Sequence, residues 1–162
     1  MNKRMPYKAK STNPNLGNRW IKGFYASQRA TTYCFTEDYE KFPVETTHYI
    51  ICDEMTDWGL PNKFRMYEVD ANTVCRNTEL KAVWEVDDVS KSCEIWEHDL
   101  LKVEYDEMVI IAEVMYTDGM FILVSNTFAD GYVPLFDYVN MENGNYHFVE
   151  AEHMGNVFDN EI

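Results

Sequence analysis

Apolar and polar residues alternate along much of this chain with a period of two, which is typical of strands that bury one face. The alternation is clearest in the last third, for example in residues 107–116. Residues 70–94 keep no sustained period of 3.6 residues, so little helix is expected. The pattern predicts strands over residues 20–27, 31–35, 47–54, 64–70, 99–105, 107–116, 120–125, 132–139 and 146–154.

Two glycine-containing turns join strands of the C-terminal half. Gly119 follows an aspartate between two β-rich segments, and Gly144 follows an asparagine in the same way. Asp-Gly and Asn-Gly pairs favour two-residue hairpin turns because glycine adopts positive φ at no steric cost. Short strands joined by tight turns are typical of a small, strongly bent β-barrel. The expected fold class is therefore mainly β, with little helix.

Four further residues are predicted to shape the chain rather than to act chemically. Glu97 and Asp99 flank a turn that opens a strand, where the Asp99 carboxylate can accept hydrogen bonds from backbone amides. Gly155 and Asn156 lie near the end of the chain, where they would let the last strand bend before it packs back. Both pairs are interpreted as structural turn residues.

The composition indicates a folded body that follows a basic start. Apolar residues make up 46% of the 162 residues and aromatic residues 15%, enough to form a hydrophobic core. Residues 1–18 are polar and basic and contain turn-forming pairs, which predicts a flexible arm. The polar segment 87–92 is expected to separate an N-terminal β-rich module, residues 19–90, from a C-terminal small β-barrel, residues 91–162.

The net charge of −14 is unevenly placed. Residues 1–36 hold seven basic residues and no acidic one, whereas residues 37–162 hold the other seven basic and all 28 acidic residues, a net charge of −21. A folded body with this much negative charge repels a phosphate backbone. Nucleic acid is therefore an unfavourable partner for residues 37–162. The basic arm keeps that option open.

The chain shows no pattern that predicts a metal site or an enzyme. Its four cysteines and four histidines contain no CxxC, HxxxH or HExxH spacing, and Cys34 and Cys52 lie in apolar segments where burial is expected. There is no glycine-rich phosphate-binding loop and no nucleophile elbow. The sequence therefore predicts no catalytic residue, no metal ligand and no cofactor.

No apolar run approaches the roughly 18–20 residues of a membrane span. The basic first residues are not followed by the apolar segment of a secretory signal. We therefore expect a cytoplasmic protein with reduced thiols and no membrane partner.

Several segments resemble the YopX family, small proteins carried by phages and prophages. The early family strand "IKGFY" is similar to residues 21–25, and the family block "TV-x-Q-x-TGL" is similar to residues 73–80. The block "I-[YFW]-E-G-D-I-V" is similar to residues 95–101, and the closing "V-I-G-N-I-[YF]-E-N" to residues 153–160. The resemblance covers roughly residues 20–160. It implies an SH3-like β-barrel in the C-terminal part, after a smaller β-rich segment, and no established enzymatic activity.

The chain departs from this family pattern at two glycines. Glu79 stands where the pattern has the glycine of "TGL", and His98 stands where it has the glycine of "EGD". If the latter glycine serves a turn with positive φ, His98 must adopt a mildly strained backbone conformation, which histidine tolerates better than most residues.

The aromatic residues outnumber what one small core needs, so some are expected to contact a partner. The candidates are Phe128 and Tyr132, which lie in a glycine-containing loop, together with Trp58. An acidic surface favours a basic protein partner, and for a phage protein that partner would be a host protein.

We therefore expect a non-enzymatic accessory protein, encoded by a phage or mobile element, that acts in the cytoplasm of a bacterial host through protein–protein contacts. Two alternatives stay open. One is a nucleic-acid-binding accessory protein that uses the basic arm. The other is a self-associating structural protein, a homo-oligomer in which the arm of one copy contacts the acidic body of the next.

Overall fold

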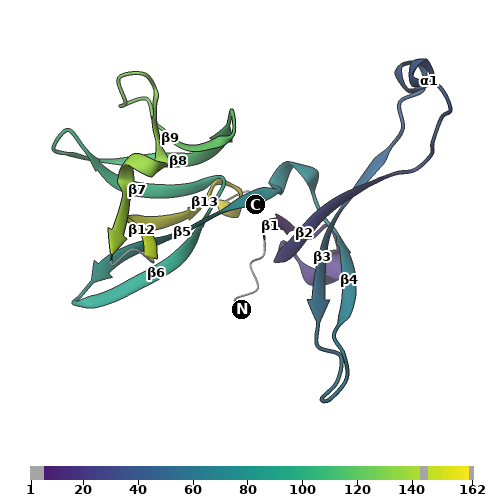
Figure 1. Cartoon of the computed structure of the whole chain (residues 1–162), viewed down its shortest axis with the longest axis horizontal. Helices are drawn as coiled ribbons and strands as arrows, with labels where there is room; N and C mark the ends of the chain where they lie inside the picture. Colours follow the sequence, from purple (N-terminus) through teal and green to yellow (C-terminus); the bar gives the residue numbers. More distant parts are fainter. Residues whose placement is uncertain (1–5, 143–145, 161–162) are drawn as a thin grey trace. The chain divides into compact units, whose positions relative to one another are not determined.

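The computed structural model describes residues 6–142 and 146–160 of the chain. Strands make up 59% of it and helices 13%, which confirms the mainly β fold class. The chain divides into two compact units, Met1–Val74 and Cys75–Ile162, called unit 1 and unit 2 below. Figure 1 shows β2, β3 and β4 of unit 1 as long, twisted strands. The strands of unit 2 curve around one another in a compact group.

Unit 1 is an antiparallel sheet in the order β1-β2-β3-β4. Five buried residues form a small hydrophobic core in this unit. The elements are β1 (Tyr7–Lys10), η1 (Pro14–Leu16), β2 (Trp20–Arg29), α1 (Thr36–Lys41), β3 (Thr46–Glu54), β4 (Lys63–Glu68) and η2 (Ala71–Thr73). The core residues are Ala9, Ile21, Ile50, Cys52 and Val69.

Strand β1 lies inside the segment that the sequence favoured as a flexible arm. Ala9 is completely buried, and this burial of apolar surface fixes the strand against β2. Lys8 and Lys10 are only 7% and 8% exposed, and their ammonium groups lie 4.5 and 5.5 Å from the ring centroid of Trp20. The two lysines are thus packed along an aromatic ring, with their charge stabilised by cation–π contact.

The strand expected over residues 31–35 is absent, because β2 continues to Arg29 and pairs with β3 instead. The connection between β2 and β3 carries the short helix α1. Cys34 in this connection is exposed, contrary to the expected burial, whereas Cys52 on β3 is buried as expected.

Unit 2 contains two groups of paired strands, in the orders β11-β12-β5-β6 and β10-β9-β8-β7-β13. All pairs within it are antiparallel except β12 with β5, which is parallel. Among the pairings of the described residues neither group closes on itself, so the SH3-like barrel stays a prediction. The strands are β5 (Cys75–Val86), β6 (Val89–Trp96), β7 (Asp99–Tyr105), β8 (Met108–Thr117), β9 (Met120–Val124), β10 (Tyr132–Pro134), β11 (Val139–Glu142), β12 (Tyr146–Glu150) and β13 (Glu152–Asn156).

Three two-residue turns join successive strands of unit 2, and all their central residues have positive φ. They are Asp87-Asp88 (53° and 61°), Asp106-Glu107 (47° and 64°) and Asp118-Gly119 (49° and 85°). Two positive φ values in a two-residue loop are the signature of a type I′ turn, whose twist matches that of the flanking strands. Aspartate takes the first position each time because its short polar side chain tolerates this conformation.

The first of these turns lies where the sequence analysis placed the boundary between modules. The segment 87–92 is not a linker, because Asp87 and Asp88 form the turn between β5 and β6 and Val86 pairs with Val89 across it. The division between the two units falls instead between Val74 and Cys75. A polar Asp-Asp pair favours a tight reversal as well as a linker, and composition alone does not separate the two.

The strand expected over residues 132–139 is interrupted. Strand β10 ends at Pro134, the 3-10 helix η3 (Leu135–Tyr138) follows, and β11 begins at Val139. Leu135 is 1% exposed, so this break turns an apolar side chain into the core. Pro134, which has no backbone N–H to donate, lies in a strand at the end of the group.

The core of unit 2 is larger than that of unit 1 and draws on most of its strands. Twelve buried residues form one cluster, and partly buried residues such as Trp84, Tyr105 and Tyr138 pack against it. The buried members are Ala82, Ile95, Leu101, Val103, Ile110, Ala112, Val114, Leu123, Phe128, Leu135, Val149 and Ala151.

The division into units also divides the charge. Unit 1 carries ten basic and nine acidic residues, a net charge of +1, whereas unit 2 carries four basic and 19 acidic residues, a net charge of −15. The acidic character of the chain therefore belongs to unit 2.

Candidate functional site

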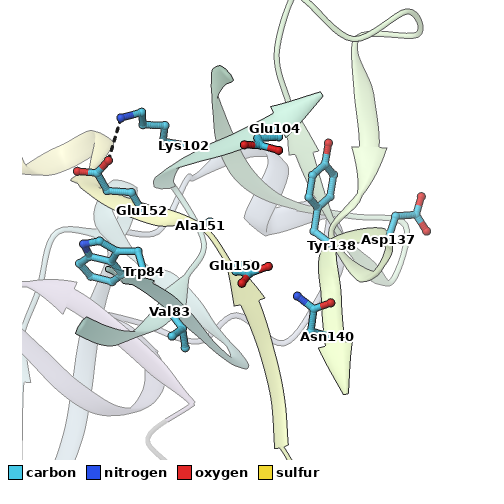
Figure 2. Close-up of a pocket in the computed structure, with 10 residues that line it drawn as sticks. All are labelled: Val83, Trp84, Lys102, Glu104, Asp137, Tyr138, Asn140, Glu150, Ala151 and Glu152. Atoms are coloured by element: carbon cyan, nitrogen blue, oxygen red, sulfur yellow. Dashed lines mark hydrogen bonds and ion pairs between the residues drawn. The ribbon is translucent and has the colours of Figure 1, made fainter. Parts of the chain in front are cut away.

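A cleft of about 500 Å³ opens in unit 2, lined by residues of β5, β7, η3, β11, β12 and β13 (Figure 2). The parallel pairing of β12 with β5 brings Glu150 opposite Val83, and the backbone N–H of Ala151 donates to the carbonyl of Val83 over 3.2 Å. Segments far apart in the sequence thus meet at one wall. The volume lies within the range of pockets that hold small ligands or side chains, roughly 300–1,000 Å³.

The cleft is acidic. Four carboxylates line it, those of Glu104, Asp137, Glu150 and Glu152, against a single cation, Lys102. The Lys102 ammonium lies 2.9 Å from Oε2 of Glu152, and both side chains are partly exposed. The other three carboxylates form no ion pair within the described residues, so the cleft presents uncompensated negative charge to solvent.

Two aromatic side chains form opposite parts of the lining. Figure 2 shows Trp84 beside the Lys102–Glu152 pair and Tyr138 on the far side, with Glu104 and Glu150 between them. Both rings are partly buried because they also pack against the core of unit 2. Core packing therefore fixes their orientation.

The phenol of Tyr138 stays protonated at physiological pH. Its pKa is raised above the ordinary value, first by desolvation and then by electrostatic interaction with Tyr105, Asp137 and Asp106. The hydroxyl is thus a hydrogen-bond donor and acceptor at the edge of the cleft.

A second polar cluster lies at the start of β7, where the sequence placed Asp99 and Asn156. Asp99 has no exposed surface; its Oδ2 accepts from the backbone N–H of Trp96 over 2.8 Å, and its Oδ1 accepts from Nδ2 of Asn156 over 2.8 Å. Nδ2 of Asn156 also donates to the carbonyl of Glu97 over 3.1 Å. The carboxylate thus accepts from the turn amide and ties the end of β13 to this turn.

His153 completes this cluster. Its Nε2 lies 3.0 Å from Oδ2 of Asp99, and its side chain is 22% exposed. Hydrogen bonding to Asp99, with a smaller contribution from Cys93, raises the pKa of His153 to about 9, against the opposing effect of burial. At neutral pH an imidazolium therefore pairs with the buried carboxylate, and the arrangement stabilises the fold.

Glu79 and His98, which stand where the YopX pattern has glycine, both have left-handed backbone conformations. φ is 63° at Glu79 and 65° at His98. The His98 side chain is held by a 2.7 Å hydrogen bond between Nδ1 and Oε1 of Glu113, and its ring packs edge-on against Phe158. These contacts help to hold a conformation that glycine adopts more readily.

The other predicted turn residues are Glu97, Gly119, Gly144 and Gly155. Oε2 of Glu97 accepts from the backbone N–H of Arg76 over 3.2 Å. Gly119 and Gly155 have φ values of 85° and 109°, and Gly155 precedes Asn156 where the pairing of β13 with β7 changes register. Gly144 lies outside the described residues.

The three candidate contact residues differ in exposure. Trp58 is 93% exposed and Tyr132 51% exposed, so both are accessible to a partner. The expectation that Phe128 contacts a partner is wrong, because this side chain is only 3% exposed. Its ring packs edge-on against that of Tyr105, with 4.9 Å between the ring centroids. Backbone hydrogen bonds within the loop at residues 125–131 fold it compactly and turn this ring into the core.

Sequence reasoning did not select the residues of the cleft as a site. Trp84, Glu104, Tyr138 and Glu150 share no motif, and the strand pairings that help to gather them, β12 with β5 and β13 with β7, are tertiary features. The excess of acidic residues in this half of the chain was the only signal in the sequence.

Within the part of the chain that the structure describes, no group of three or more histidine, cysteine or acidic side chains is arranged to hold a metal ion. The helices of the described ranges are all too short or too polar to cross a membrane. No family model, curated protein or solved structure matches the chain.

Proposed function

We propose that this chain is a non-enzymatic accessory protein that binds a basic segment of a protein partner through unit 2. The observation that carries the proposal is the separation of charge, −15 in unit 2 against +1 in unit 1. A compact β-unit with this excess of carboxylates attracts basic surfaces and steers them towards it. The acidic cleft gives such a segment a place to dock.

Kinship with the YopX family, and with it an origin in a phage or mobile element, is part of this proposal. Its support is the positive φ at Glu79 and His98, the positions where the family pattern has glycine. A backbone that needs left-handed residues at these two points fits the turns of that pattern. The proposal includes an SH3-like arrangement of unit 2 and a host protein as partner in the bacterial cytoplasm.

The proposal is tested by affinity capture from a bacterial lysate with the full chain at low and at high salt. We expect basic proteins that bind at low salt and elute as the salt concentration rises. Recovery of no salt-sensitive protein would overturn the proposal. Nuclease treatment of the captured material distinguishes a protein partner from nucleic acid, and light scattering against ionic strength detects a homo-oligomer.

Two matched variants locate the binding unit, each with four exposed acidic side chains changed to the corresponding amides. The unit 2 variant should lose most of the captured protein and the unit 1 variant should keep it, since only unit 2 carries a large excess of negative charge. Equal loss from both would contradict the assignment to unit 2. The changed residues are Glu85, Glu104, Asp130 and Glu150 in unit 2, and Glu37, Glu40, Glu45 and Glu68 in unit 1.

A further inference from the structure

We propose that the cleft between Trp84 and Tyr138 binds the guanidinium group of an arginine in the partner's basic segment. This inference rests on the proposed function and names the chemical class that the cleft recognises. It follows from three features of the lining: its carboxylates, its aromatic rings and its rigidity.

The carboxylates supply the charge for a cation. Glu104, Asp137 and Glu150 have no ion-pair partner in the described residues, and the only lining cation is already paired with Glu152. A cation that enters between Trp84 and Tyr138 therefore meets the carboxylates of Glu104 and Glu150 and displaces no existing pair. Carboxylates bind a guanidinium through short, charge-assisted hydrogen bonds that are often bidentate.

The aromatic rings select a flat cation. Trp84 and Tyr138 line the same cleft as Glu104 and Glu150, and in Figure 2 they lie on different sides of these carboxylates. A guanidinium is planar and weakly hydrated and stacks on aromatic rings, whereas an ammonium is compact and strongly hydrated. The lining thus favours arginine over lysine.

The same chain already pairs guanidinium groups with aromatic rings elsewhere. The guanidinium carbon of Arg76 lies 4.1 Å from the ring centroid of Tyr116, and that of Arg29 lies 4.9 Å from the ring centroid of Tyr39. In the cleft, rings of the same kind are accompanied by carboxylates and have no arginine among the lining residues.

The cleft needs little reorganisation to bind. Trp84 and Tyr138 pack against the core of unit 2, and Ala151 at the base is 4% exposed. Side chains fixed in advance lose little conformational entropy when a ligand arrives. The volume of about 500 Å³ also leaves room for residues that flank the arginine, so an extended segment fits better than a free amino acid.

The test uses the full chain, labelled with ¹⁵N, and a capped peptide in which three arginines alternate with glycines. Matched peptides carry lysine or the uncharged arginine analogue citrulline at the same positions. Titrations followed by NMR should shift the indole N–H signal of Trp84 with the arginine peptide. We expect severalfold weaker binding of the lysine peptide, and no binding of the citrulline peptide.

Two double variants of equal charge change separate the cleft from the general acidic surface. Glu104→Gln with Glu150→Gln should weaken binding of the arginine peptide at least tenfold, because two charged acceptors are lost. Glu85→Gln with Asp130→Asn changes two exposed carboxylates outside the cleft lining and should weaken binding less than twofold. Thermal unfolding of each variant checks that the fold is kept, and the NMR titration of the unaltered chain tests the site without any substitution.

The outcomes separate the two proposals. Equal weakening by both double variants, or peptide binding that leaves the Trp84 indole unmoved, would overturn the arginine cleft while leaving partner binding by unit 2 intact. The same conclusion follows if the lysate yields salt-sensitive partners but the arginine peptide does not bind. Failure of both the lysate capture and the peptide titration would overturn the proposed function together with the cleft.

Discussion

Nε2 of His153 lies 3.0 Å from Oδ2 of Asp99, a carboxylate that has no exposed surface. Removing a carboxylate from water is costly unless it is paired and hydrogen-bonded, and Asp99 meets this condition with the Trp96 amide, Asn156 and the His153 imidazolium. The pair thus joins β7 to β13 by charge at a point where the sheet pairing is irregular.

This pair predicts that the chain loses stability at alkaline pH. The pKa of His153 is about 9 in the folded state and about 6.5 when the chain is unfolded. The folded state binds this proton more tightly, so the stabilisation is complete below pH 6.5 and is lost as the pH rises through 9. We expect the free energy of unfolding to fall by about 3 kcal/mol over this window.

Urea denaturation at several pH values measures this fall, and NMR titration of the imidazole measures the pKa itself. A His153→Gln variant should lack the decline, and the control His48→Gln, at a histidine of unit 1, should keep it. Parallel stability profiles for the unaltered chain and His153→Gln would show that the pair does not stabilise the fold.

The three type I′ turns of unit 2 predict opposite effects of two substitutions. Glu107 and Gly119 both stand at the second position of a two-residue turn. Their φ values are 64° and 85°. Because a left-handed conformation costs a residue with a Cβ roughly 1–2 kcal/mol, partly offset by the flexibility of glycine when unfolded, Glu107→Gly should stabilise the chain by about 0.5–1 kcal/mol. Gly119→Glu should destabilise it by about 1 kcal/mol. Chemical denaturation of both variants checks this, and a change of the same sign in both would refute the argument.

The burial of Phe128 predicts that its role is in stability. Phe128→Ala removes a core ring that packs against Tyr105, so we expect a loss of about 3–5 kcal/mol in the free energy of unfolding. Tyr132→Ala, at an exposed side chain of the same loop region, should cost less than about 1 kcal/mol. Thermal or urea unfolding separates the two, and a small effect of Phe128→Ala would mean that the ring is not in the core.

Gly23 on β2 predicts a strong effect of adding one methyl group. A Cβ at this position would lie 2.3 Å from the carbonyl oxygen of Ile51, a backbone atom that cannot rotate away. Gly23→Ala should therefore destabilise the chain by about 2 kcal/mol or more, whereas Ser27→Ala at an exposed position of the same strand should have little effect. If urea unfolding finds the two variants equally stable, β2 and β3 do not approach each other this closely.

Local sequence patterns predicted strands in both halves of the chain, namely β2, β3 and β4 as well as β7, β8 and β9, but they missed β5 and β6. Residues 99–105 and 120–124 alternate in polarity or are bounded by turn residues, and they form β7 and β9. Strand β1 was not predicted, because a four-residue segment with two lysines looks solvated until Trp20 is placed beside it. The segment at Asp87 and Asp88 favours a boundary between modules because a polar Asp-Asp pair is typical of linkers as well as of tight turns.

The cleft was beyond sequence reasoning for a different reason. Glu104 and Glu150 lie 46 positions apart in the chain, and they line one cleft only because β13 pairs with β7 while β12 pairs with β5. Local periodicity carries no information about which distant strands pair. The hydrogen bond from a turn amide to Asp99 was predictable because the donor, the N–H of Trp96, is only three residues away.

The crowding of 19 acidic residues in unit 2 has a consequence for its own folding. Like charges repel one another in the compact state, and dissolved ions weaken that repulsion. Moderate salt should therefore raise the free energy of unfolding of unit 2. The same salt weakens the binding of a basic partner to this unit. A rise in ionic strength therefore has two opposite effects: it raises the stability of unit 2 and lowers its affinity for a basic partner.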